Sequence, residues 1–80
     1  MASHFWRVIS EQQLSKMVAH GAYMGASAAL ERARTIKKGG HTPAIFHNRL
    51  DGFMVLDEDD PAQKKRVLEL RRGPKPISRR

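Results

Sequence analysis

The hydrophobic and polar positions at the start of the chain predict a short strand followed by a helix. Residues 4–9 are mostly aromatic or β-branched, which is typical of a strand. Ser10 suits a helix N-cap, and Gln13 stands three residues later, where its side chain can complete a capping box. Ile9 and Leu14 are spaced to form a hydrophobic staple across this start. We therefore expect a strand that ends before Ser10 and a helix that begins directly after it.

The predicted helix runs from Glu11 to about Lys37. Lys37 and Lys38 suit the negative end of a helix dipole, and Gly39-Gly40 is a stop signal. At about 1.5 Å per residue, such a helix is roughly 40 Å long. This is long for a chain of 80 residues.

This helix is expected to be apolar on two opposite faces. One stripe contains Leu14, Met17, Val18, Gly21, Gly25, Ala28 and Ile36. The opposite stripe contains Ala19, Tyr23, Ala26, Leu30 and Ala33. A solvated helix normally has one apolar stripe, so two stripes require two partners. We expect a small sheet to cover one of them, and either the chain's own tail or a second chain to cover the other.

Gly21 and Gly25 indicate close packing against this helix. Each lowers the helix propensity by about 1 kcal/mol relative to alanine, so a packing reason for them is expected. The small residues of segment 20–29 would let another backbone approach closely. We therefore predict a homodimer through the second stripe, whose interface residues are Ala19, Tyr23, Ala26, Leu30 and Ala33.

Residues 43–58 have the pattern of a β-hairpin, with Asp51-Gly52 as a strong turn signal. A two-residue loop and a five-residue loop both fit this pattern. We favour the longer loop because it pairs apolar residues with each other, for example Ile45 with Val55.

Residues 61–72 are compatible with two structures. Asp60-Pro61 at the start and Gly73-Pro74 at the end have the punctuation of a short helix. The stretch from Arg66 to Arg71 alternates well enough to form a third hairpin strand instead. We slightly favour the strand, because three antiparallel strands bury a helix better than a two-stranded ribbon does.

The sequence as a whole predicts a single small α+β domain. Eighty residues leave no room for a second core, and 40% hydrophobic with 29% charged residues is ordinary globular composition. Residues 1–72 are expected to form a short N-terminal strand and one long helix packed on a small antiparallel sheet. Residues 73–80, which contain proline, lysine and arginine, are expected to be a flexible basic tail.

Catalysis and metal binding are not expected. The chain has no cysteine, which excludes thiolate metal sites and cysteine nucleophiles and fits a reducing compartment. No catalytic histidine, serine or glycine-loop motif is present. The acidic run 57–60 lacks the spacing of a calcium loop, and we expect Asp59 or Asp60 to cap the following element. We therefore predict no catalytic residues, no metal and no cofactor.

Charge points to polyanionic partners. The formal net charge is +7. The acidic run 57–60 cancels the net positive charge of residues 1–56, so residues 61–80 carry a charge equal to that of the whole chain. The cations gather at the end of the predicted helix and in the last segment, and they form one patch if that segment returns along the sheet. The residues expected to contact a polyanion are Arg32, Arg34, Lys37, Lys38, Lys64, Lys65, Arg66, Arg71, Arg72, Lys75, Arg79 and Arg80.

The predicted function is non-catalytic binding, by a homodimer whose basic surface contacts nucleic acid or another polyanion. The alternative is an inhibitor or adaptor, of the kind that a phage or mobile element encodes, which occludes the surface of a target protein. No apolar run approaches the roughly 20 residues of a membrane span, so a cytoplasmic protein without membrane contact is expected. No family-specific motif is present to choose between these functions.

Overall fold

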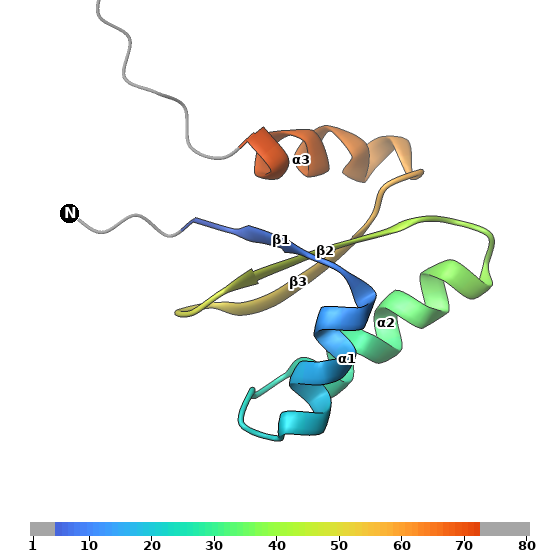
Figure 1. The fold of residues 1–80 in the computed structure, drawn as a ribbon. Coiled ribbons are helices and arrows are strands. Elements are labelled where there is room, and N and C mark those ends of the chain that lie inside the picture. The colour runs from blue at the N-terminus through green and yellow to red at the C-terminus, as the bar shows by residue number, and fades with distance from the viewer. Residues whose placement is uncertain (1–4, 73–80) are drawn as a thin grey trace, which may run out of the picture.

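The structure is a computed structural model that describes residues 5–72 (Figure 1). Its strands are β1 (Arg7–Ile9), β2 (Pro43–Asn48) and β3 (Gly52–Asp57), and its helices are α1 (Glu11–His20), α2 (Ala26–Lys38) and α3 (Pro61–Arg72). The strands form an antiparallel sheet in the order β1-β2-β3. The predicted α+β class is confirmed. The predicted tail, residues 73–80, lies outside the described residues, and so do three of the expected cations, Lys75, Arg79 and Arg80.

The strand register is the one favoured by the apolar pattern. Ile45 in the central strand lies opposite Ile9 of β1 and Val55 of β3. A one-residue shift would move Ile45 and Val55 to the opposite face of the sheet, so burial of that face specifies the register.

The hairpin loop is shorter than expected. Both strands extend one residue further into it, so that Asn48 pairs with Gly52 and residues 49–51 form the loop. The buried Asn48 side chain organises this turn, because its Oδ1 accepts a hydrogen bond from the Leu50 N–H at 2.8 Å. Gly52 supplies the left-handed backbone, with φ of 91°, that returns the chain into β3.

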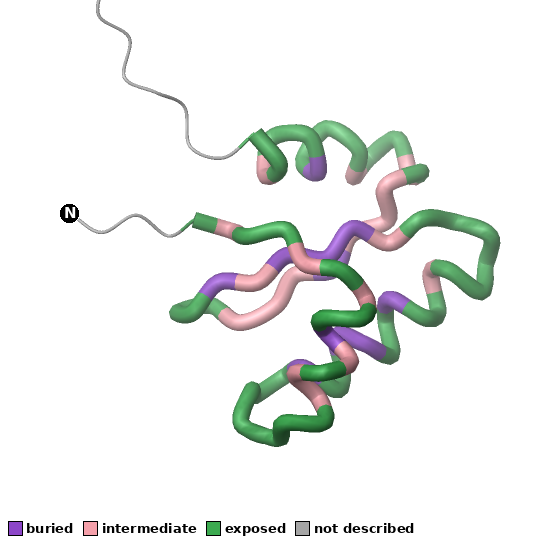
Figure 2. The backbone as a smooth tube through the Cα atoms, viewed as in Figure 1, coloured by how far each residue is buried: buried purple, intermediate pink, exposed green. Residues whose placement is uncertain are grey.

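Helices cover both faces of the sheet: α1 and α2 lie on one face and α3 on the other (Figures 1 and 2). Successive residues of β2 point to opposite faces. Ile45 belongs to the core under α1 and α2, together with Leu14 and Leu30. Phe46 belongs to a second core, with Val67 of α3. The central strand is therefore buried on both sides, which explains its run of apolar residues.

α1 begins with the capping box that the sequence predicts. The Gln13 N–H donates to Ser10 Oγ at 3.0 Å, and the Ser10 N–H donates to Gln13 Oε1 at 2.8 Å. Leu14 is fully buried, and Ile9 packs against the same cluster.

The single long helix predicted over residues 11–37 is wrong, because the chain breaks into α1 and α2 between His20 and Ala26. Gly21 and Gly25 adopt left-handed backbone, with φ of 83° and 85°, a conformation that costs other residues free energy. Gly21 ends α1 by donating its N–H to the Met17 and Val18 carbonyls. The two glycines thus serve the turn rather than a close approach of another backbone.

The turn folds α2 back along α1. Glu11 at the start of α1 lies 3.4 Å from Lys37 Nζ at the end of α2, so the two helices are antiparallel neighbours. This arrangement directs the second predicted stripe into the sheet: Ala26, Leu30 and Ala33 are 1%, 7% and 0% exposed. The expectation that these three residues face a second chain is therefore wrong, since the chain's own core already covers them.

The strand favoured for residues 66–71 is also wrong, because α3 occupies residues 61–72 and β1 is the third strand. Asp60 caps α3 as expected, since its Oδ1 accepts a hydrogen bond from the Ala62 N–H at 3.0 Å. The free edge of β3 is occupied by side chains: Arg32 Nε donates to the Val55 carbonyl at 3.0 Å, and Gln63 Oε1 accepts from the Asp57 N–H at 2.8 Å. As a helix, this segment covers the second face of the sheet and buries Phe46 and Val67. As a further strand of the same sheet, it would leave that face exposed to water.

Candidate functional site

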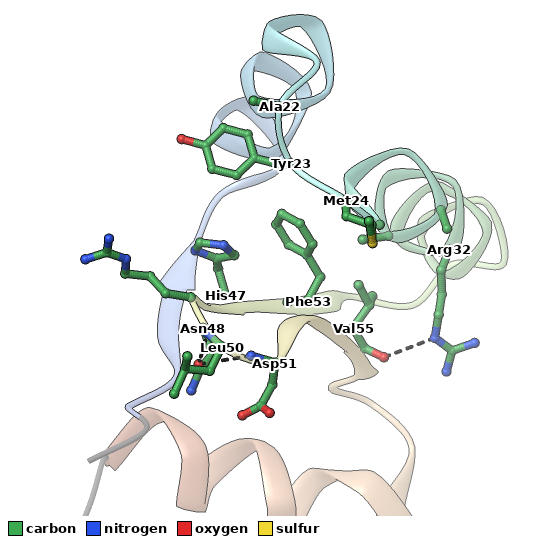
Figure 3. A pocket seen from close by; sticks show the side chains of 15 residues that line it. Ala22, Tyr23, Met24, Arg32, His47, Asn48, Leu50, Asp51, Phe53 and Val55 are labelled. Carbon is green, nitrogen blue, oxygen red and sulfur yellow. Dashed lines mark hydrogen bonds between the residues drawn. The ribbon is translucent and has the colours of Figure 1, made fainter. Parts of the chain in front are cut away.

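A groove of about 610 Å³ lies between the α1–α2 turn, the flank of α2 and the β2–β3 hairpin (Figure 3). Two local features of the sequence form it. The paired glycines of the turn hold residues 22–24 out beside the sheet, and the three-residue hairpin loop brings residues 49–51 to the other side. Phe53 and Val55 of β3 lie between these two loops.

Aromatic rings form one wall of the groove. The Tyr23 and His47 ring centroids are 5.9 Å apart with planes at 83°, and the His47 and Phe53 centroids are 4.7 Å apart. Outside the groove, the His20 ring lies 5.6 Å from that of Tyr23. Such edge-to-face and tilted contacts stabilise a wall of fixed shape.

The surroundings of His47 favour its neutral form. Burial lowers the pKa of His47 below its ordinary value of 6.5, and the positive charge of Arg7, its cross-strand neighbour, lowers it further. At neutral pH this ring therefore contributes an uncharged surface beside Tyr23 and Phe53.

The rim of the groove is apolar and exposed to solvent. Met24 is 93% exposed, Leu50 is 70% exposed and Tyr23 is 42% exposed. Residues 5–72 contain six large hydrophobic side chains with substantial exposure, and these three surround the same groove. Grouped exposed apolar residues beside a concave surface are typical of a binding site, whereas scattered ones are not.

The charged groups of the groove are Arg32, Arg49 and Asp51. Arg32 is fixed in place by its hydrogen bond to the Val55 carbonyl, drawn in Figure 3. Within the part of the chain that the structure describes, no carboxylate lies within 4.0 Å of the Arg32 or Arg49 side-chain nitrogens. The groove therefore presents two guanidinium groups that are available for an anionic ligand.

The structure divides the predicted polyanion-binding residues into two groups instead of one patch, because α2 and α3 lie on opposite faces of the sheet (Figure 1). On the α2 side, Arg34 and Lys37 approach Glu11 at 3.7 and 3.4 Å, which reduces their attraction for an external anion. Lys38 is exposed at the end of the helix.

On the other side, α3 has an apolar inner face and a basic outer surface. Val67 is fully buried, and Leu70 packs against the same cluster. The exposed cations of this helix are Lys64, Lys65, Arg66, Arg71 and Arg72. Arg71 donates two hydrogen bonds to Glu58, at 3.0 and 2.7 Å, and this pairing lowers the pKa of Glu58. Among residues 5–72, the other four cations have no carboxylate within 4.0 Å.

The acidic run has a local structural role. His41 Nδ1 contacts Asp57 Oδ2, and Asp59 Oδ2 accepts a hydrogen bond from the Thr42 N–H at 2.7 Å. With Asp60 capping α3, these carboxylates tie the segment before β2 to the turn that follows β3.

Two residues that the sequence singled out line the groove: Tyr23, predicted as a dimer contact, and Arg32, predicted as a polyanion contact. The sequence did not indicate the groove itself. Of the predicted interface residues, Tyr23 alone lines the groove, and Ala19 is exposed elsewhere on α1. Leu50 carries a recognisable signal, because it is a large apolar residue in the predicted hairpin loop. Met24 carries none, because the sequence predicts a helix there and the turn between α1 and α2 is seen only in the structure. His47, Arg49 and Phe53 carry none, since the β2–β3 pairing is what brings them beside Tyr23.

No protein-family model, no curated protein and no solved structure matches this chain significantly. None of the helices described, α1 to α3, has the length and apolar character needed to cross a bilayer. The groove and the outer surface of α3 are the two candidate binding surfaces among residues 5–72.

Proposed function

We propose that the protein is a non-catalytic binding protein whose outer α3 surface contacts nucleic acid or another polyanion. One observation carries this proposal: Lys64, Lys65, Arg66 and Arg72 are exposed on one helix, with no carboxylate within 4.0 Å among residues 5–72. Phosphate contacts require positive charge held at a defined surface, and they need no base-reading motif.

The attachment of α3 to the sheet supports this function. Val67 is fully buried, and the Gln63 side chain bonds both to the Asp57 N–H and to Asp60. The helix therefore offers its cations from a fixed position. From Lys64 to Arg72 it extends about 12 Å at about 1.5 Å per residue, a length over which duplex DNA carries about seven phosphate charges.

Salt dependence tests the proposal. Binding of fluorescent duplex and single-stranded oligonucleotides is measured by anisotropy between about 50 and 200 mM salt. The double variant Lys64→Gln/Lys65→Gln should lower the slope of log affinity against log salt by about 1.8, since each lost duplex phosphate contact accounts for about 0.9.

The matched control is Lys16→Gln/Lys38→Gln, which also removes two exposed lysines from helices but on the other side of the sheet. This control should leave the slope unchanged. An equal decrease of the slope in both variants would mean that binding depends on the net charge of the protein and not on the α3 surface, which would contradict the proposal. Absence of oligonucleotide binding at the lowest salt would also contradict it.

Deletion of residues 73–80 measures how much the basic end of the chain contributes to polyanion binding. It removes Lys75, Arg79 and Arg80, so the slope should fall by up to about three units if all three contact phosphates. An unchanged slope would confine the interaction to α3.

A further inference from the structure

The groove beside the α1–α2 turn has the features of a second binding site, independent of the basic surface of α3. Met24 and Leu50 stand on its two sides at 93% and 70% exposure, although this small chain buries Leu14, Leu30 and Phe46 almost completely. Figure 2 shows that the hairpin tip and the α1–α2 turn are exposed to solvent. Contact with water is unfavourable for such side chains, and a partner that covers them gains the corresponding hydrophobic free energy.

The interior of the groove suits an apolar side chain. Phe53, Val55 and Ala29 line it. Tyr23 stands against His47 at one end (Figure 3). Its volume of about 610 Å³ is large enough for one or two large side chains. The exposed methionine at the rim is unbranched and adapts its shape, which is characteristic of surfaces that accept peptide segments.

The charge of the groove selects among apolar partners. Two guanidinium groups, Arg32 and Arg49, and one carboxylate, Asp51, line the groove. Arg7 of β1 is paired with His47 of β2 and adds a further positive charge nearby. Guanidinium groups pair with carboxylates in bidentate geometry, so acidic residues that flank the apolar side chain would be bound in addition.

The ring geometry argues against a nucleobase as the occupant. Tyr23, His47 and Phe53 pack edge-on or tilted against one another, and the rings do not form a parallel slot in which a base could stack. The four cations of α3 without a carboxylate within 4.0 Å among residues 5–72 lie on the opposite side of the sheet, where they offer a phosphate backbone a separate surface.

We propose that this groove docks an acidic, amphipathic segment of a partner protein, with a large apolar side chain inserted between Tyr23, Met24 and Leu50 and carboxylates paired with Arg32 and Arg49. Because α3 lies on the other face of the sheet, this segment and a polyanion can be held at the same time. The protein then connects an acidic protein segment to a polyanion.

Selection from a random peptide library displayed on phage, with the full chain immobilised, tests the proposal. Enriched peptides should combine aspartate or glutamate with leucine, methionine or aromatic residues. The synthetic peptides are labelled, and their affinity is measured by fluorescence anisotropy. Met24→Ala/Leu50→Ala should weaken binding about tenfold or more, as loss of central apolar anchors does. Arg49→Ala should weaken it severalfold and reduce its salt dependence.

Leu68→Ala is the matched control, because Leu68 is 50% exposed on α3, away from the groove. It should leave peptide affinity within about twofold of the unchanged protein, as peripheral contacts do. All four substituted residues are exposed, so the variants should remain folded, which circular dichroism verifies.

Four results would overturn the inference. The first is a selection that enriches no acidic, apolar peptides, and the second is peptide binding that the Met24 and Leu50 substitutions leave unchanged. The third is a dimer in sedimentation velocity that Leu50→Glu dissociates, which would assign the groove to a second copy of the chain. The fourth is a shift of the amide resonances of residues 47–53 on addition of oligo(dT), which would assign it to single-stranded nucleic acid. Failure of the α3 variants to affect oligonucleotide binding would overturn the proposed function of α3 and the connection to a polyanion, whereas the docking of the acidic segment depends on the peptide results alone.

Discussion

Replacement of Gly21 and Gly25 by alanine, singly and together, perturbs the backbone of the α1–α2 turn without removing a side chain. Both glycines have left-handed φ angles, 83° and 85°, which cost an alanine about 1–2 kcal/mol. An added Cβ meets nothing within 4 Å at Gly21, and at Gly25 it meets only Phe53 Cδ2 at 3.9 Å, an ordinary contact. The cost is therefore that of the backbone alone.

The reduced freedom of the unfolded chain offsets part of this cost, by about 0.4–1 kcal/mol per glycine replaced. The expected net loss of stability is about 1 kcal/mol at each site, after subtraction of this offset from the left-handed cost. For a domain of this size, 1 kcal/mol corresponds to a decrease in Tm of roughly 4–8 °C.

Urea denaturation followed by circular dichroism measures these changes, with Gly39→Ala as the matched control. Gly39 also ends a helix, but its φ is −79° and an added Cβ would lie 3.5 Å from the Ile36 carbonyl oxygen, at ordinary contact distance. This variant should be as stable as the unchanged chain, or slightly more stable.

An increase in stability on Gly21→Ala and Gly25→Ala would refute the two-helix structure. In one continuous helix each alanine would stabilise the chain by about 1 kcal/mol, so the sign of the effect decides between the two backbones. D-alanine introduced at either site by chemical synthesis favours left-handed φ and should raise stability; a decrease would also refute the reasoning.

Three further predictions concern the helix cap, the docking of α3 and the dependence of stability on pH. Ser10→Ala should lower stability by about 1 kcal/mol in urea denaturation, because the Gln13 N–H loses its acceptor; an unchanged midpoint would contradict the capping role. Val67→Ala should lower it by about 2 kcal/mol, because it leaves a cavity under α3, and amide exchange should accelerate most in that helix; uniform acceleration would count against local detachment. The Asp57 carboxylate raises the pKa of His41 above its ordinary 6.5, so the stability from this contact is fully present below pH 6.5 and is lost as pH rises through the raised pKa. His41→Asn should remove that decrease from urea midpoints measured between pH 5.5 and 9, and a decrease of equal size in the variant would exclude His41 as its source. The pKa of Asp57 is lowered below 3.8, so its share is lost only as pH falls through that lowered pKa.

The two histidines near the sheet illustrate how neighbouring groups set titration in this fold. His41 has a carboxylate beside it, and its pKa rises, whereas His47 is partly buried beside Arg7 and its pKa falls. The sequence places both in or beside one strand and contains no signal that separates them. The separation comes from strand pairing, which brings Arg7 opposite His47, and from the segment before β2, which brings His41 to Asp57.

Interactions between residues close in sequence account for what the sequence predicted well. The Ser10–Gln13 capping box spans one helical turn, and the Asp60 cap and the Asp51-Gly52 turn act over similarly short distances. The register of Ile45 against Val55 was also predictable, because a shift would move apolar residues into water.

The break between α1 and α2, the helical state of residues 61–72 and the groove depended on contacts between distant parts of the chain. Helical periodicity continues through Gly21 and Gly25, so the pattern could not show that the chain gains more by folding α2 back, where Ala26, Leu30 and Ala33 are buried against the sheet. Residues 66–71 have a pattern that suits either a strand or a helix. The uncovered side of Phe46 and the occupied edge of β3 favour the helix, and both exist only after the sheet has formed. The amino-acid pattern thus determined the local elements, because their energies arise within a few residues. Tertiary packing determined where the helices end, which state residues 61–72 adopt and which elements lie side by side, because burial of apolar surface outweighs the small differences in local propensity.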